Sequence, residues 1–162
     1  MVEIFFYQSD GPPKNLLFTL LERSRSQEWN VLVLCSDQDE VNFLHDQLWV
    51  QPENRFVGIG KAGTEYDELQ PVLISDKTVY SNNPHVVILS GNCEVQQTDI
   101  KKFKRVMVIF NQNDQVELEA SRQKWKTLSK LGCHMKLFRQ NNSRWSLQAE
   151  ANQNQAREIE SS

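Results

Sequence analysis

Hydrophobic residues in this chain gather in short, nearly continuous runs separated by longer amphipathic stretches. The four strongest runs are rich in β-branched or aromatic residues: VEIFFY from Val2, VLVLCS from Val31, HVVILSG from His85 and RVMVIFN from Arg105. Such runs are typical of strands covered on both faces, as in a parallel sheet. Two weaker runs predict short or edge strands, PVLIS from Pro71 and HMKLFRQ from His134.

Amphipathic helical patterns lie between these runs, at residues 14–28, 37–49 and 115–131. Their predicted apolar stripes are, in chain order, Leu16, Leu17, Leu20 and Leu21; Val41, Leu44 and Leu48; and Val116, Leu118, Trp125, Leu128 and Leu131. Ser36 or Asp37 is a plausible N-cap for the second helix, and Gly132 ends the third. Strands alternating with helices predict a three-layer α/β/α fold with a mainly parallel central sheet, Rossmann-like in topology but without a nucleotide site.

One domain followed by a polar tail is the predicted organisation. A chain of 162 residues is long enough to bury a single continuous core. After Trp145 the sequence SLQAEANQNQAREIESS offers too little apolar surface to offset the entropy of ordering it. We therefore expect an α/β domain over residues 1–145 and a mostly disordered tail over residues 146–162.

Charge and cysteine usage narrow the functional classes. A net charge of −3 and a pI near 5.6 give no overall basic field, which disfavours autonomous binding to a phosphate backbone. The three cysteines are scattered and fit neither a disulfide framework nor a zinc site. The N-terminal MVEIFFYQ is too short for a signal peptide or a membrane span. The expectation is a soluble, cytoplasmic protein with no membrane association.

The segment GIGKAG, residues 58–63, matches the GxGxxG pattern of dinucleotide-binding loops. A nucleotide-binding, Rossmann-like enzyme that uses these glycines is therefore the alternative function. The context argues against it, because the motif follows a Pro-Glu-Asn break and leaves no room for a crossover helix before Pro71. Signatures of a Walker A loop and of common catalytic sites are absent from the sequence. We assign no catalytic, cofactor-binding or metal-binding residue.

Two features have both an ordinary and a functional interpretation. Arg122, Lys126 and Lys130 form a basic ridge at helical spacing, which is either a solvated face or a site for an acidic partner. Trp49 and Phe56 are either core residues or aromatic anchors for a docking partner. From the residues alone, both interpretations stay open for these two aromatic side chains.

Several segments match one known family in amino-acid sequence and in their order along the chain. They are FFY at 5–7, LWVQPENRFV at 48–57, PVLIS at 71–75, VVILSGN at 86–92, FKRVMVIF at 103–110, ASRQKWKTLSKLG at 120–132 and RW at 144–145. Collinear over about 145 residues, they resemble the chi subunit of bacterial DNA polymerase III, a small clamp-loader accessory protein. The polar tail has no part in the likeness.

The resemblance implies a non-catalytic subunit that links the polymerase to the single-stranded DNA-binding protein and reaches DNA only indirectly. In the family, the acidic, Phe-terminated tail of that protein docks on the Trp of the LW segment and an Arg of the third helix, here Trp49 and Arg122. Lys126 is expected to add a second cation for this tail. Phe56 matches the surface used for the small psi subunit or alternative partners.

Two departures from the family pattern bear on these sites. Gly58 and Ile59 stand where many members have Pro-His. Leu118 stands one turn before Arg122, at a position that is often basic, so electrostatic attraction is expected to rest on Arg122 and Lys126. A further rival function is direct binding of single-stranded DNA, with aromatic side chains as stacking platforms.

Overall fold

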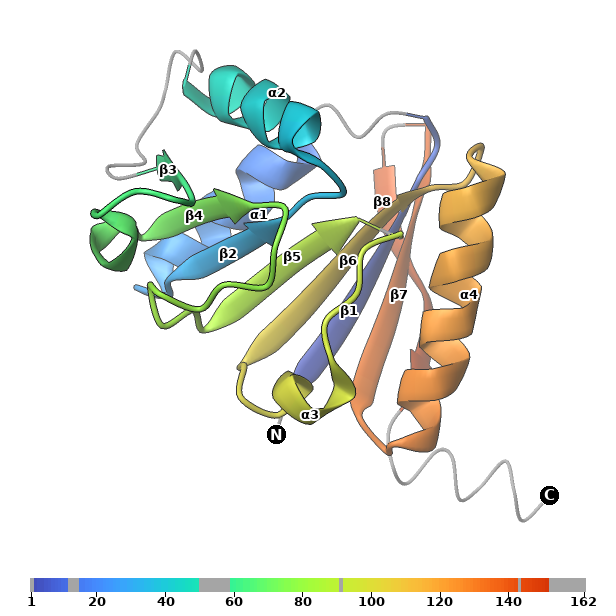
Figure 1. Ribbon diagram of the computed structural model, residues 1–162. Helices are drawn as coiled ribbons and strands as arrows, with labels where there is room; N and C mark the ends of the chain where they lie inside the picture. The colour runs from blue at the N-terminus through green and yellow to red at the C-terminus, as the bar shows by residue number, and fades with distance from the viewer. Residues whose placement is uncertain (1, 12–14, 50–58, 91, 143, 152–162) are drawn as a thin grey trace, which may run out of the picture. The chain divides into compact units, whose positions relative to one another are not determined.

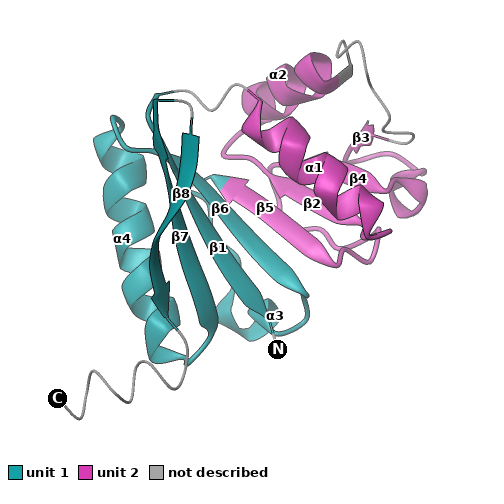
Figure 2. Ribbon diagram, turned by 180° about the vertical axis from the view of Figure 1, so that it is seen from behind, with its two compact units in different colours: residues 1–13, 90–162 teal, residues 14–89 magenta. Residues whose placement is uncertain are grey.

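The computed structural model describes residues 2–11, 15–49, 59–90, 92–142 and 144–151, with the side chain of Trp49 excepted (Figure 1). The chain divides into two compact units, one of residues 1–13 and 90–162 and one of residues 14–89 (Figure 2). In the described residues, both units combine parallel strands with helices, which confirms the predicted α/β class.

The unit of residues 14–89 has strands that are nearly all buried. Its elements are α1 (Leu16–Ser26), β2 (Val31–Leu34), α2 (Gln38–Trp49), β3 (Ile59–Lys61), the 3-10 helix η1 (Asp67–Leu69), β4 (Val72–Ser75) and β5 (Val86–Ser90). The strands follow the order β3-β4-β2-β5, and each neighbouring pair is parallel. Every residue of β2 and β4 is buried, as expected of strands covered on both faces. The prediction for β4 was a short or an edge strand; it is short, at 4 residues, and lies between β3 and β2.

The helices of this unit bury most of their predicted stripes. In α1, Leu20 and Leu21 are 1% and 0% exposed, whereas Leu16 and Leu17 are half-buried. In α2, Val41 and Leu48 are buried and Leu44 is half-buried. The predicted cap is also present: Asp37 Oδ1 accepts a hydrogen bond from the backbone N–H of Glu40 at 2.8 Å.

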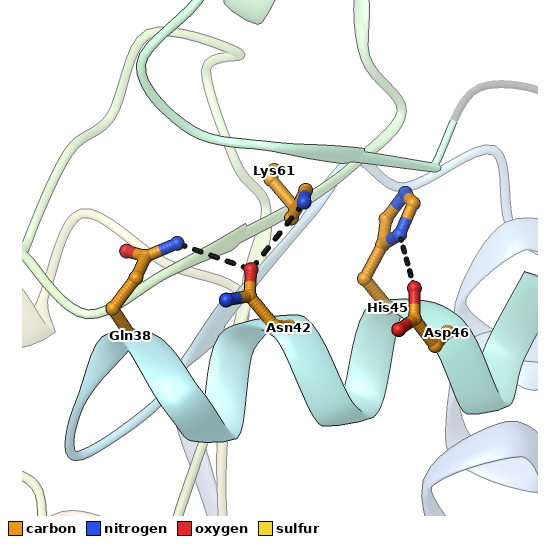
Figure 3. A network of polar contacts seen from close by, with 5 residues as sticks. All are labelled: Gln38, Asn42, His45, Asp46 and Lys61. Carbon is orange, nitrogen blue, oxygen red and sulfur yellow. Dashed lines mark hydrogen bonds and ion pairs between the residues drawn. The ribbon is translucent and has the colours of Figure 1, made fainter.

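Polar contacts link α2 to β3 within this unit. Figure 3 shows Lys61 Nζ donating to Asn42 Oδ1 at 3.3 Å, while Gln38 Nε2 donates to the same oxygen at 3.4 Å. One turn after Asn42, His45 Nδ1 lies 3.6 Å from Oδ1 of its sequence neighbour Asp46. Of these contacts, the one from Lys61 joins β3 to α2, and it contributes little free energy because it is exposed.

The unit of residues 1–13 and 90–162 carries the basic helix. Its elements are β1 (Glu3–Ser9), α3 (Gln97–Ile100), β6 (Arg105–Asn111), α4 (Gln115–Lys130), β7 (His134–Asn141) and β8 (Arg144–Ala151). The strands follow the order β6-β1-β7-β8, parallel except for the antiparallel pair β7-β8. β7 is therefore flanked on both sides, which corrects its prediction as an edge strand.

Helix α4 begins and ends as its sequence requires. Asp114 caps it by accepting from the N–H groups of Val116 and Glu117, at 3.0 and 3.2 Å. Gly132, with φ of +74°, provides the left-handed turn that stops it. Two positions of its predicted apolar stripe are exposed instead of buried: Val116 is 68% and Leu131 48% exposed, because both lie at the helix ends beyond the part that packs on the sheet.

Strand β8 occupies residues where a disordered tail was expected. The boundary placed at residue 146 falls inside β8, which pairs with β7 through to the Met135 and Ala151 register. The signal was present in the sequence, because Trp145, Leu147, Ala149 and Ala151 alternate with polar residues as in a strand with one covered face. The prediction of disorder was based on the polar composition of the whole segment, which does not reveal this alternation. Residues 152–162 lie outside the described part of the chain.

Candidate functional site

A pocket of about 490 Å³ lies between helix α4 and the strands of its own unit. We call it the α4 pocket. Its apolar lining consists of Phe6, Phe110, Leu118, Trp125, Leu137 and Ala149. Its polar lining consists of Gln8, Gln112, Asn113, Ser121, Arg122, Lys126 and Arg139. Sequence reasoning had proposed two of these, Arg122 and Lys126, as partner-binding residues, and the fold brings both to this one pocket.

Aromatic side chains form the floor of the α4 pocket. Phe6 is 1% exposed and meets the half-buried Trp125 edge-on, with ring centroids 5.3 Å apart. Phe110 adds a second edge-on contact to Phe6 at 6.5 Å. Strand register continues this apolar row, because Phe6 pairs with Leu137 on β7, and Leu137 pairs with Ala149 on β8. The floor offers an apolar ligand group flat and edge-on surfaces to pack against.

Three cations line the same pocket from two walls. Arg122 and Lys126 are one turn apart on α4, and Arg139 comes from β7, two residues beyond Leu137 on the same face of the strand. All three are exposed, and none has an ion-pair partner in the described part of the chain. Their positive charge is thus available to an anionic ligand.

Lys124 differs from these three cations although it lies on the same helix. It is half-buried and does not line the pocket. Burial lowers the pKa of Lys124, and this outweighs the opposing influence of Glu94 and Cys93. Of the four cations of α4, Arg122 and Lys126 line the pocket, Lys124 is partly desolvated within the protein, and Lys130 is exposed away from the pocket.

Among the uncharged polar residues that line the pocket, Ser121 differs from the others, which are hydrogen-bonded. Gln8 Nε2 donates to Gln112 Oε1 at 2.9 Å, and Gln112 Nε2 donates to Asp10 Oδ1 at 2.9 Å. Ser121, in contrast, is 2% exposed, and its hydroxyl has no hydrogen-bond partner among the described residues. Sequence reasoning missed Ser121 and Arg139, since neither belongs to a motif and only the packing of α4 on β7 brings them to the same pocket.

The two aromatic residues proposed for partner binding stay untested. Trp49 is the last residue of α2, in the other unit, and the position of its side chain is outside what the structure describes. Phe56 lies in segment 50–58, also outside the described residues. Their roles remain predictions.

The glycine motif does not build a phosphate-binding loop in its described part. Gly60 lies within β3, and the segment leads into the short η1 instead of a long helix. At Gly63, φ is +109°, and the carboxylate of Asp67 accepts from the N–H groups of Gly63 and Thr64 at 2.9 and 3.1 Å. These hydrogen bonds lower the pKa of Asp67. A carboxylate of the chain itself already occupies the backbone donors that a phosphate would need.

The described residues form an α/β protein with a pocket that combines an apolar lining with three exposed cations. Within the described residues, no group of side chains has the composition of a metal site, and none of the helices has the length and apolar character of a membrane span. The family model for the DNA polymerase III chi subunit, HolC, matches residues 1–136. The chain therefore belongs to this family.

Membership gives the chain a role in DNA replication as an accessory subunit of the DNA polymerase III holoenzyme. A comparison with curated proteins gave no match. The matched residues end within β7, so Leu137, Arg139 and Ala149, which complete the α4 pocket, lie beyond them.

Proposed function

We propose that the chain is a replication adaptor that binds the acidic, phenylalanine-terminated tail of the single-stranded DNA-binding protein in the α4 pocket. The observation that carries the proposal is one pocket combining an aromatic floor with three cations that have no ion-pair partner in the described residues. A tail that ends in an aromatic residue preceded by carboxylates complements this pocket in both shape and charge. Membership in the chi family supports the same partner.

The terminal aromatic ring of the tail packs against Phe6 and Trp125 on the pocket floor. Burial of one such ring contributes roughly 1.5–3 kcal/mol. The acidic residues that precede it extend along Arg122 and Lys126, whose spacing of one helical turn suits carboxylates two residues apart on one face of an extended segment. The opposite charges of the tail and the pocket accelerate association, and burial of the terminal ring stabilises the complex.

Two aromatic residues outside the α4 pocket are also assigned to partner binding. The resemblance assigns Trp49 to the tail site and Phe56 to a surface for the psi subunit or an alternative partner. In this scheme the chain acts in the cytoplasm within the clamp-loader complex, performs no catalysis itself and reaches DNA through the single-stranded DNA-binding protein. The adaptor thereby couples the polymerase to DNA that is already covered by protein.

Calorimetric titration with a synthetic acidic peptide that ends in phenylalanine tests this function. The expected result is saturable binding that weakens as salt is added, because exposed charges are screened over about 10 Å at 0.1 M salt. Two control peptides separate the contributions: one with the acidic residues changed to amides, and one with the final phenylalanine changed to alanine. Equal binding of all three peptides, or of none, contradicts the proposal.

Fluorescence anisotropy of a labelled oligonucleotide tests the rival of direct DNA binding. We expect no change when the chain is added alone and an increase when it is added to oligonucleotide already covered by the single-stranded DNA-binding protein. A rise with the chain alone favours direct contact.

A further inference from the structure

Helix α2 displays an aromatic ring on its solvent-exposed side. Phe43 is 59% exposed, whereas Val41 and Leu48 of the same helix are buried. Phe43 does not belong to the apolar stripe of α2, so packing within the fold does not account for a phenylalanine at this position. A single exposed apolar residue is ordinary on a protein surface, so the residues around Phe43 decide whether it is a docking residue.

Carboxylates flank Phe43 on both sides along the helix. Asp39 lies one turn before it and Asp46 one turn after it, and both are exposed. Two further acidic residues near the start of the helix, Asp37 and Glu40, are engaged locally as hydrogen-bond acceptors. None of the 12 residues of α2 is a lysine or an arginine. The exposed side of α2 therefore presents one aromatic ring between two anionic groups.

The same chain carries a surface complementary to this side of α2. The α4 pocket combines an aromatic floor with Arg122, Lys126 and Arg139, which have no ion-pair partner in the described residues. Formal charge is divided in the same sense: residues 14–89 contain six Lys and Arg against eleven Asp and Glu, and the other unit contains twelve against ten. The unit that carries α2 is thus anionic and the unit that carries α4 cationic. Opposite charges therefore attract α2 of one copy to α4 of another.

We propose that helix α2 of one copy docks on the α4 pocket of a second copy, with the ring of Phe43 on the pocket floor and Asp39 and Asp46 beside the pocket cations. The inference rests on the proposed function, since one pocket receives both ligands, and it adds competition between them. Contact between different surfaces of identical chains is heterologous, so each complex keeps one free α2 and one free α4 pocket. Association therefore continues head to tail as concentration rises, and a bound acidic tail blocks it.

Sedimentation velocity of the full chain, without any peptide, measures this self-association. We expect the average sedimentation coefficient to rise with protein concentration, because the contact joins separate copies. Added salt should lower it again, since the charges that flank Phe43 are exposed and are screened. A sedimentation coefficient that stays constant over the whole concentration range contradicts the proposal.

Three variants of the unit that carries α2 locate its docking residues. Phe43→Ala should weaken association about tenfold or more, the effect of removing a central aromatic residue of an interface. Asp39→Asn combined with Asp46→Asn removes charge alone and should weaken it about threefold. Tyr66→Ala is the matched control, because Tyr66 is an aromatic residue of the same unit, 56% exposed, that is not on α2. The control should associate like the unmodified chain, and equal effects of Phe43→Ala and Tyr66→Ala would overturn the role of α2.

A mixture of two defective variants tests whether α2 and the α4 pocket bind each other. Phe43→Ala keeps an intact α4 pocket, and the double variant Arg122→Ala and Lys126→Ala keeps an intact α2. Each variant alone should sediment as a monomer at concentrations where the unmodified chain associates. Their mixture should form complexes of two chains that grow no further, because the remaining surfaces are the defective ones. A mixture that sediments as its separate components contradicts the pairing.

The outcomes separate this inference from the proposed function. Calorimetry with the acidic, phenylalanine-ended peptide at low protein concentration measures the function alone. If the peptide binds and the chain stays monomeric at every concentration, the function stands and the inference is wrong. If the chain associates through Phe43 and the peptide does not bind, the inference stands and the function is wrong. When both are observed, saturating peptide should return the chain to monomers, and association that persists would overturn the place of α2 in the α4 pocket.

Discussion

Replacement of Arg122 by alanine tests the electrostatic half of the proposed site. Arg122 lines the α4 pocket from the helix, has no ion-pair partner in the described residues and is exposed in the free protein. Its removal should therefore leave the fold intact and act on ligand binding alone. Lys130 is the matched control, because it lies on α4 with the same charge but does not line the pocket.

The expected magnitude follows from exposure and distance. A fully solvated ion pair contributes about 0.2–1 kcal/mol, and a hydrogen bond to a charged group about 1.5–3 kcal/mol. A contact at the mouth of a pocket that the ligand partly closes falls between these, so Arg122→Ala should cost about 1–2 kcal/mol, or about 5- to 30-fold in affinity. Lys130 lies two turns further along, about 12 Å from Arg122, beyond the screening length of about 10 Å at 0.1 M salt. Lys130→Ala should cost less than about 0.3 kcal/mol.

Calorimetry with the acidic, phenylalanine-ended peptide at two salt concentrations measures both variants. The difference between Arg122→Ala and the unmodified chain should shrink at high salt, because screening removes part of the contribution that the mutation deletes. Circular dichroism confirms that the variants are folded. Equal affinities for Arg122→Ala and Lys130→Ala would refute the reasoning, since they would mean that net charge and not position attracts the ligand.

Three further predictions concern other parts of the chain. Trp49→Ala should weaken peptide binding by about 2 kcal/mol or more with the circular dichroism spectrum unchanged; a loss of folding would instead identify Trp49 as a core residue. Asp114→Ala removes the cap of α4 and should lower the free energy of unfolding in urea by about 1 kcal/mol, and an unchanged midpoint would contradict that role. His134 Nε2 lies 3.0 Å from Glu150 Oε1, and this hydrogen bond lowers the pKa of Glu150. The pair therefore stabilises the fold at pH values above the pKa of Glu150 in the unfolded chain. This contribution is lost as the pH falls through the pKa of Glu150 in the folded chain. A carboxyl NMR titration should find the pKa of Glu150 raised in His134→Ala; an unchanged value would remove the hydrogen bond as its cause.

The strands of the core could be predicted from sequence because strands buried on both faces are apolar at almost every position. In β2 and β5 all but the last residue of β5 are buried, and the sequence shows this as runs of apolar residues. The helices were visible through their spacing, although Val116 at the start of α4 proved exposed. β8 was missed for a different reason. Its apolar residues alternate with polar ones, but the stretch as a whole is polar, and even Leu147 is 50% exposed.

Two of the three cations of the pocket could be predicted from the sequence, and the third depends on tertiary structure. Arg122 and Lys126 are one turn apart on one helix, so their proximity is a local property of the sequence. Arg139 is distant from them in sequence and reaches the pocket only because β7 packs beneath α4. The hydroxyl of Ser121 carries no sequence signal either, since a serine inside a helix normally donates to a carbonyl of the preceding turn.

Leu118, which departs from the family pattern, is one of the residues that line the α4 pocket. The resemblance leads to the expectation of a basic residue at this position, and Leu118 instead adds apolar surface to the lining. A cation is nevertheless present on the opposite wall, where Arg139 of β7 lines the same pocket. Arg139 lies beyond the residues that the family model matches. The positive charge is thus divided between α4 and β7. A ligand held from two walls is constrained in direction as well as position, since its anionic groups must reach both sides of one apolar floor.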